Sequence, residues 1–454
     1  MSTAQNLSVI RAKQALINGE FTQATILIKD GKITAIEAID FPLNDNANVY
    51  QCDTTLLPGI VDTHVHINEP GRTDWEGFDT ATHAAAAGGI TTLVDMPLNC
   101  IPVTISESDF EEKLAVIGEK LWVDAGFWGG ATADNLGDLP RLLDRGVLGV
   151  KSFTIHSGIE EFKHVNEEQL LNAMRVVAQK GLVHLVHAEI DDGKHDDDKI
   201  GSSYMGFLHS RPASWEDDAI AMVIRVMRKL KAEGLEPRAH IVHLSAASAL
   251  PLIKQAKAEG LQLSVETCPH YLCFQAETIP DGKTTFKCCP PIREKHNCEA
   301  LWAALKDGTI DAIVSDHSPC TPQLKHIDTG DLEAAWGGIS GLQFGLSLIH
   351  NEAIELGFTL ADISQLMSTR SAEIAGIADI KGSIEIGKDA DFCVFDADSS
   401  YTINADMIHH KHKVTPYAGK TVKGEIKATI LGGRLIYQDR IFFGKAEGRP
   451  LFSQ

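Results

Sequence analysis

Eight short apolar runs recur through the middle of the chain, and longer stretches with helical periodicity separate many of them. The runs lie at residues 59–65, 91–97, 123–129, 149–155, 182–188, 239–245, 263–269 and 311–317. Helical stretches such as 166–181, 214–234 and 248–260 end at glycine, the usual C-terminal stop of a helix. Strands that alternate with helices predict parallel βα units. Eight units in sequence favour an α/β fold of the closed (β/α)8 TIM type over an open doubly wound sheet.

Both ends of the chain have a different pattern, in which apolar and polar residues alternate. Residues 24–39 contain two alternating runs joined by Asp30-Gly31, which is a strong β-hairpin signal. The same pattern returns at 382–398 and 424–440. We therefore expect a small β-sandwich domain assembled from the N- and C-terminal segments. The expected division is 1–56 and 383–454 for the two parts of the sandwich and 57–382 for the barrel.

The composition of the 454 residues, 44% apolar and 23% charged, is that of an ordinary globular protein. A formal net charge of -21, without clustered Lys and Arg, argues against a nucleic-acid partner. Nine cysteines without a CxxC pair indicate reduced thiols in a cytoplasmic protein. Neither a secretory signal nor a run of about 18 apolar residues occurs, so we expect no membrane partner.

Polar side chains interrupt these apolar runs, mostly near their carboxyl ends. They are His64, His66, Lys151, His187, His243 and Asp316. In a barrel, the carboxyl ends of the strands converge on one mouth, where active sites are built. Because residues two apart on a strand point the same way, His64 and His66 should face together. One histidine at a strand end is more often a core residue, but four imidazoles and a carboxylate indicate a centre for divalent metal.

Lys151 differs from the rest of this set because an ammonium group would repel a metal. If burial lowers its pKa, the neutral amine can react with carbon dioxide and give a carbamate, whose two oxygens can bridge two metals. For an isolated lysine, a salt bridge is the simpler interpretation. Two metals roughly 3.5 to 4 Å apart can share a bridging hydroxide and polarise a carbonyl, which is chemistry that hydrolyses amides. Asp316 could act as the proton shuttle between this nucleophile and the leaving nitrogen.

The motifs, taken in order, resemble those of the cyclic amidohydrolases, the family of dihydroorotases, hydantoinases or dihydropyrimidinases, and allantoinases. The similar stretches are "PGIVDTHVHINEPG", "VKSF", "LVHAE", "IVHLS", "ETCPHYL", "KCCPPIRE" and "IVSDHSP". The resemblance spans about residues 20 to 440. It implies two metal positions: His64, His66 and Asp316 at the first, His187 and His243 at the second, and Lys151, as N6-carboxylysine, between them.

Fewer residues decide which cyclic substrate fits. Dihydroorotases typically carry an arginine for the substrate's carboxylate two positions after the second histidine, where this chain has Asn68. The stretches "DMPLNCIPVT", "IHSGIEEFKHV" and "AWGGISGLQFGLSL" resemble the allantoinase branch. The resemblance thus implies ring opening of allantoin to allantoate in purine catabolism. A hydantoinase or dihydropyrimidinase acting on another cyclic ureide stays open. A non-catalytic scaffold is disfavoured because all six ligands are present.

Three further residues are weaker candidates for contact with the substrate: Asn68, Asn99 and Cys289. Asn99 and Cys289 match positions that contact substrate in related enzymes, although a turn residue and a small buried thiol are equally good interpretations. Arg72 and Arg293 could bind a carboxamide, but ion pairing is the favoured interpretation for both.

The expected cofactors are two divalent metal ions, together with the carbon dioxide that carboxylates Lys151. Zinc fits the ligands, and cobalt, manganese or iron would fit nearly as well, since selection depends on availability. The resemblance also implies a homotetramer. The acidic run 191–198 lacks the glycine and glutamate spacing of an EF-hand and indicates a solvated loop near the barrel mouth.

Overall fold

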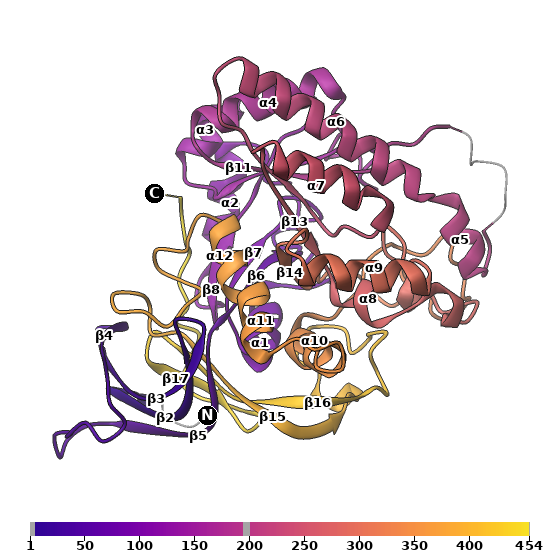
Figure 1. Cartoon of the computed structure of the whole chain (residues 1–454). Coiled ribbons are helices and arrows are strands. Elements are labelled where there is room, and N and C mark those ends of the chain that lie inside the picture. The colour runs from indigo at the N-terminus through magenta and orange to yellow at the C-terminus, as the bar shows by residue number, and fades with distance from the viewer. Residues whose placement is uncertain (1–4, 194–199, 454) are drawn as a thin grey trace.

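The computed structural model describes residues 5–193 and 200–453. Its middle part is a barrel of parallel strands with helices around it, and strands from both ends of the chain lie together along one side (Figure 1). The predicted (β/α)8 barrel with a β-sandwich built from the N- and C-terminal segments is therefore confirmed.

The barrel strands follow one another in chain order, each parallel to the next. They are β6 (Ile60–Val65), β7 (Ile90–Asp95), β8 (Asp124–Phe127), β9 (Gly129–Gly130), β10 (Gly149–Phe153), β11 (Val183–His187), β12 (Arg238–Ile241), β13 (Gln262–Thr267) and β14 (Ala312–Ile313). The strands β8 and β9 are two parts of one extended stretch. Its first part, β8, pairs with β7, and its second part, β9, pairs with β10. Each of the eight predicted runs thus contributes to the barrel.

The first and last strands of the barrel meet and close it. The His66 N–H donates to the His317 carbonyl at 2.8 Å, and an isolated parallel bridge joins Val65 to His317. The Ser315 N–H donates to the carboxylate of Asp62 at 3.2 Å. Closure brings the histidines at the end of β6 beside the segment that follows β14.

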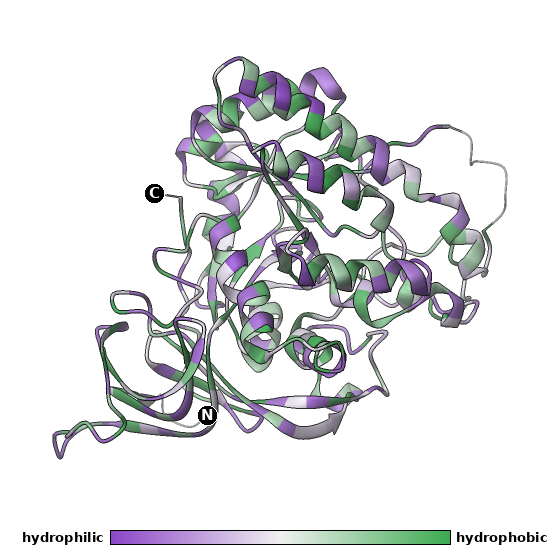
Figure 2. Cartoon of the chain, viewed as in Figure 1, coloured by the Kyte–Doolittle hydropathy of each residue, from purple (hydrophilic) through white to green (hydrophobic). Residues whose placement is uncertain are grey.

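Helices cover the outside of the barrel. They are α1 (Phe78–Ala87), α2 (Glu107–Ile117), α3 (Leu139–Asp144), α4 (Glu167–Gln179), α5 (Tyr204–Ser210), α6 (Ala213–Ala232), α7 (Leu250–Ala258), α8 (Pro269–Cys273), α9 (Lys295–Lys306), α10 (Gly345–Ala353), α11 (Leu360–Ser364) and α12 (Arg370–Ile374). Hydrophobic and hydrophilic residues alternate along α4 and α6 in Figure 2, because one face of each helix is buried. No helix in the described ranges is long and apolar enough to span a membrane.

The start of α4 shows how local sequence sets a helix boundary. Asn166 accepts the Gln169 N–H at 3.0 Å, and the Gln169 side chain accepts the Asn166 N–H at 2.9 Å. This capping box satisfies two N–H groups that the first turn of a helix leaves without partners. At the other end, Gly181 has a φ of 70°, which suits a glycine that terminates a helix. The helix therefore begins and ends where the sequence predicts.

The strands from the two chain ends form one nine-stranded sheet. They are β1 (Gln5–Asn6), β2 (Val9–Ile17), β3 (Glu20–Lys29), β4 (Lys32–Glu37), β5 (Val49–Pro58), β15 (Phe392–Thr402), β16 (Thr421–Leu431), β17 (Arg434–Gln438) and β18 (Ile441–Phe442). The sheet encloses a separate core to which Ile26 and Leu56 contribute from one end of the chain and Phe392 and Ile430 from the other. The proposed limits 1–56, 57–382 and 383–454 remain a prediction.

The predicted hairpin lies between β3 and β4, which pair antiparallel. Asp30 and Gly31 both have positive φ, 51° and 75°. Two such residues match the twist of the flanking strands in a two-residue turn, and Asp-Gly adopts that conformation at low cost.

Two barrel strands are shorter than the sequence predicts. The strand β12 ends at Ile241 and β14 at Ile313, so His243 and Asp316 lie beyond their strands and do not close them. Both residues have positive φ, 39° and 43°. The chain has left the strand ladder before it reaches them, and this backbone conformation, uncommon for residues other than glycine, aims both side chains at the barrel mouth.

A buried ion cluster joins the barrel to the sheet. The Lys381 Nζ lies 2.6 Å from Asp124, 2.9 Å from Asp389 and 2.5 Å from Asp391. Asp124 begins β8, whereas the other two carboxylates precede β15. Burial alone would lower the pKa of Lys381, but the three carboxylates raise it above its ordinary value. Lys381 is therefore charged, and its ammonium group stabilises the three buried carboxylates.

We expect Lys381→Ala to lower the free energy of unfolding by about 3–5 kcal/mol, because the buried carboxylates lose their central cation. The control is Lys254→Ala, whose exposed pair with Asp307 should contribute at most about 1 kcal/mol. Urea denaturation at pH 7 measures both variants. Equal stability of the two variants would contradict this role of the cluster.

Candidate active site

A cavity of about 610 Å³ opens at the carboxyl ends of the barrel strands. The predicted site residues that line it are His66, Asn99, Lys151, His187, His243, Cys289 and Asp316. His64 is fully buried directly behind them, with its Nε2 3.2 Å from the Lys151 Nζ. These eight residues come from the ends of seven barrel strands or from the segments that follow them, and they reach one place, as the barrel geometry predicts.

One group of possible metal ligands comprises His64, His66 and Asp316. Each offers a ligand atom within 4.8 Å of the others. The Asp316 Oδ1 lies 3.3 Å from the His64 Nε2 and 3.8 Å from the His66 Nε2. Burial, reinforced by the charge of Lys151, holds the pKa of both histidines well below its ordinary value. Both rings are therefore neutral, which is the form that binds a metal.

Asp316 also needs a cation. Burial raises the pKa of its carboxyl to about 7, although Lys151 opposes this effect. A divalent ion between these atoms would stabilise the carboxylate form. Two neutral imidazoles and a buried carboxylate suit zinc and neighbouring divalent ions, so this group fits a metal.

A second group comprises His187, the last residue of β11, and His243, which follows the neighbouring strand β12. The His187 Nδ1 is 3.0 Å from the His243 Nε2, so the two nitrogens converge on one point. Burial lowers the pKa of both rings, which leaves them neutral. Nitrogen ligands of one zinc ion at roughly 2.0–2.1 Å approach each other at a similar separation. This pair also fits a metal.

Lys151 lies next to the first group. Burial lowers the pKa of its ammonium to about 8, even though Asp316 and Glu266 raise it. The neutral amine, which can react with carbon dioxide, is therefore a minor fraction at pH 7 and becomes the major form above about pH 8. The charge state that the carbamate hypothesis requires is thus available.

Carboxylates that sequence reasoning missed support the histidines from behind. The Glu266 Oε1 contacts the His64 Nδ1 at 2.5 Å, and its Oε2 contacts the His240 Nε2 at 2.9 Å. The Glu189 Oε2 contacts the His187 Nε2 at 2.7 Å. Metal-binding histidines commonly donate their second N–H to a carboxylate in this way.

A signal for these carboxylates was present in the sequence. Glu189 follows His187 by two positions, the spacing that points both side chains the same way on a strand. Glu266 is an acidic residue in an otherwise apolar run, which is costly unless it has a partner. Burial alone would raise the pKa of Glu189, but Arg211 and His187 lower it to about 2. Glu189 is therefore ionised and accepts hydrogen bonds only.

The candidate substrate contacts differ in position. The Asn99 Nδ2 lies 3.3 Å from the His66 Nδ1, and its Oδ1 is buried beside the cavity with no hydrogen-bond partner among the described residues. Cys289 lines the cavity as well. Asn68 is absent from the cavity lining in the part of the chain described, and its amide donates to the Pro319 carbonyl at 3.2 Å. Asn68 therefore binds the segment that contains Pro319, next to the cavity-lining Ser318.

The favoured interpretation of the two arginines is confirmed. Arg72 pairs with Glu161 at 3.3 Å, and Arg293 pairs with Glu216 at 2.7 Å. In the acidic run, the Gly193 N–H donates to Asp191, which lines the cavity. Residues 194–198 of that run lie outside the described part of the chain.

Comparison with known proteins agrees with this geometry. The model of the amidohydrolase family matches residues 55–436. An allantoinase from Streptomyces avermitilis is 48% identical over 438 residues, which cover 96% of each chain. An allantoinase from Saccharomyces cerevisiae is 42% identical over 446 residues, 95% of each chain. The chain belongs to the allantoinase group of the amidohydrolase family.

Among solved structures, the L-hydantoinase (dihydropyrimidinase) from Arthrobacter aurescens is similar, with a TM-score of 0.91 and 26% identity. The match covers 99% of this chain and 100% of that one. The resemblance to the cyclic amidohydrolases that the motifs indicated is therefore confirmed along nearly the whole chain, and the amidohydrolase fold accounts for both the barrel and the sheet beside it.

Proposed function

We propose that this chain, a hydrolase of cyclic amides, opens the ring of allantoin to give allantoate. The observation that carries the proposal is the convergence of His64, His66 and Asp316 beside the His187–His243 pair in one cavity. Near-full-length similarity to allantoinases supports the choice of substrate.

We propose that two divalent ions would be held here: His64, His66 and Asp316 would bind the first, His187 and His243 would bind the second, and Lys151, carboxylated on Nζ, would be a ligand of both. When bound, the two ions supply Lewis-acid activation of the attacking water and of the scissile carbonyl. Zinc is the proposed metal, and cobalt, manganese or iron suit the same ligands.

Asp316 is the proposed proton shuttle. Its Oδ1 accepts a hydrogen bond from the Ser318 hydroxyl at 2.6 Å and faces His64, which leaves Oδ2 to take a proton from the water and pass it to the leaving ring nitrogen. Asn99 offers its unpartnered Oδ1 to a ring N–H of the substrate. Cys289, on the cavity wall, is proposed to contact the substrate through its backbone.

The cavity favours a neutral substrate over a carboxylated one. Asn68 takes the place of the arginine that binds the carboxylate in dihydroorotases. Two cations that line the cavity are already engaged, because Arg211 pairs with Glu189 and the Lys287 Nζ donates to two backbone carbonyls. The alternative function is hydrolysis of another neutral cyclic ureide, which the fold similarity to L-hydantoinase supports.

A cytoplasmic location and a homotetramer complete the proposal. The nine cysteines are all free thiols, and most are buried, which suits a reducing compartment. The tetramer rests on the family resemblance alone. Light scattering coupled to size-exclusion chromatography tests it, and a monomer at micromolar concentration would refute it.

The substrate proposal is tested with protein reconstituted with zinc and bicarbonate. We expect allantoin to be opened far faster than dihydrouracil, unsubstituted hydantoin or dihydroorotate. Dihydroorotate should be the poorest substrate, because the one arginine among the described cavity-lining residues, Arg211, is already paired with Glu189. Initial rates for each compound provide the measurement. Faster opening of dihydrouracil or hydantoin would favour the alternative function, and no turnover with metal bound would restore the scaffold hypothesis.

The proton-shuttle role predicts that Asp316→Asn lowers kcat by about 10²-fold or more. The variant should keep at least one metal, because His64 and His66 remain. Asp311→Asn is the matched control, since this half-buried carboxylate near the start of β14 pairs with Lys257 at 2.6 Å and lies away from the cavity. Steady-state kinetics and metal analysis report on both variants. Undiminished turnover in Asp316→Asn would assign the proton transfer to another group.

Carboxylation of Lys151 predicts a defined pH dependence for reconstitution. Carbon dioxide reacts with the neutral amine, whose fraction increases as the pH rises through the pKa of about 8. In chelator-treated protein at a fixed pressure of ¹³C-labelled carbon dioxide, the carbamate NMR signal should form faster at pH 8.5 than at pH 6.5. Lys151→Ala should give no such signal and no ring opening. A rate independent of pH, or an active Lys151→Ala protein, would exclude the carbamate.

A further inference from the structure

The carboxylate of Glu189 contacts the nitrogen of His187 that faces away from His243. The distance from the Glu189 Oε2 to the His187 Nε2 is 2.7 Å, and the His187 Nδ1 lies 3.0 Å from the His243 Nε2. A carboxylate can only accept, so Nε2 carries the proton and donates it to Glu189. The lone pair of His187 is therefore on Nδ1, directed toward His243.

The end of β10 and the residue after it hold His187 and Glu189 in place. The ring of Phe153 stacks on the ring of His187, with centroids 4.3 Å apart and planes inclined by 15°. The Thr154 hydroxyl lies 2.7 Å from the Glu189 carbonyl, and the Glu189 N–H donates to the same hydroxyl at 3.1 Å. Because one face of the His187 ring is stacked, the main motion left to the ring is a half-turn flip about its Cβ–Cγ bond. A flip would remove Nε2 from Glu189, so the hydrogen bond selects one orientation.

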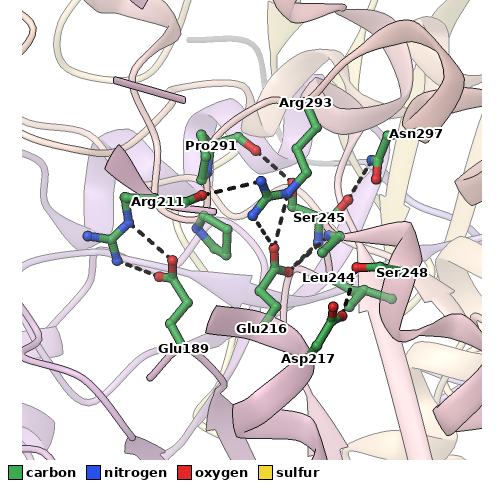
Figure 3. Close-up of polar contacts among 12 residues, drawn as sticks. Glu189, Arg211, Glu216, Asp217, Leu244, Ser245, Ser248, Pro291, Arg293 and Asn297 are labelled. Atoms are coloured by element: carbon green, nitrogen blue, oxygen red, sulfur yellow. Dashed lines mark hydrogen bonds and ion pairs between the residues drawn. The ribbon is translucent and has the colours of Figure 1, made fainter. Parts of the chain in front are cut away.

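Arg211 holds Glu189 in turn. Its Nε donates to the Glu189 Oε1 at 3.1 Å and its Nη2 to the Oε2 at 2.5 Å, which is a two-pronged pairing. The Arg211 carbonyl accepts from the guanidinium of Arg293, which forks onto Glu216 (Figure 3). Glu189, Glu216 and Arg293 are all nearly fully buried. The arginine that holds the Glu189 carboxylate is therefore itself held by a second buried ion pair.

We propose that Glu189 is a positioning residue that fixes the tautomer and ring orientation of His187 for the second metal position, and that Arg211 fixes Glu189. The inference rests on the proposed second position, to which His187 and His243 belong. It does not depend on which cyclic ureide is hydrolysed. Removal of such a supporting partner typically weakens metal binding 10- to 100-fold.

The effect should be confined to one of the two metals. His64, at the first position, has its own carboxylate in Glu266, at 2.5 Å from its Nδ1. Glu266 also contacts His240 but is separate from the Glu189–Arg211 pair. Loss of Glu189 should therefore release the second metal and leave the first in place.

The test measures zinc per chain at controlled free zinc in the full-length protein, together with the visible spectrum of the cobalt-substituted form. We expect Glu189→Ala to bind the second zinc 10- to 100-fold more weakly and to lose the part of the cobalt spectrum that arises from that position. Glu189→Gln, whose amide oxygen can still accept from His187, should lose less than Glu189→Ala. It is also the variant better able to fold, because it preserves the side-chain shape.

Asp124→Asn is the matched control, since it removes a buried carboxylate paired with Lys381 at the opposite end of a barrel strand. It should unfold at a lower temperature and keep both zinc ions and the full cobalt spectrum. Two tightly bound zinc ions in Glu189→Ala and in Glu189→Gln would overturn the inference. Equal weakening of both metals in Glu189→Gln would also overturn it, because that result indicates a general structural role.

The wild-type protein separates this inference from the proposed function. If it binds two zinc ions but does not open allantoin, the substrate proposal fails, and the zinc affinity of the Glu189 variants still decides the role of Glu189. If it binds a single zinc ion even at high free zinc, the second position is refuted, and the positioning role is refuted with it.

Discussion

Closure of the barrel between its first and last strands is the constraint on which the site depends. The His66 N–H bonds to the His317 carbonyl, and the Ser315 N–H bonds to Asp62. These contacts join segments about 250 residues apart in sequence. Without them, the histidines at the end of β6 would not meet Asp316, which follows the last strand. The metal position closest to this seam is therefore a product of the topology, and no local segment of the chain could form it alone.

The same closure buries several ionisable groups, and the structure compensates each of them with partners. Burial disfavours the charged forms of His64, Lys151 and Asp316, so the histidine stays neutral, the lysine loses its proton more easily and the carboxyl holds its proton more tightly. A metal ion bound beside Asp316 would stabilise its charged carboxylate and offset the cost of burying it. Behind the histidines, Glu266 and Glu189 accept their second N–H groups. Unpaired charges in the barrel interior are thus unfavourable, and the same residues are well suited to a metal centre.

Much of the fold could be predicted from local patterns, because each βα unit contains its own periodicity and stop signals. The Asp30-Gly31 turn and the start of α4 at Asn166 follow from residues within a few positions. The ends of β12 and β14 could not be placed in this way. In the sequence, His243 and Asp316 lie within apolar runs that look like continuous strands. In the structure they lie beyond the strand ends, because a strand ends where its hydrogen bonds to the neighbouring strands end.

By itself, the sequence determined the order of strands and helices, the polar residues near the strand ends and the family to which the chain belongs, since these depend on residue type and on spacing of two to a few positions. Only the tertiary structure decided that Glu189 supports His187, that Asn68 contacts Pro319 and lies outside the cavity, and that Arg211 is already paired. Such pairings depend on which distant segments pack side by side and on the depth at which each side chain is buried. The packing of distant segments and the depth of burial are set when the barrel closes, and the spacing of residues along the chain does not encode them.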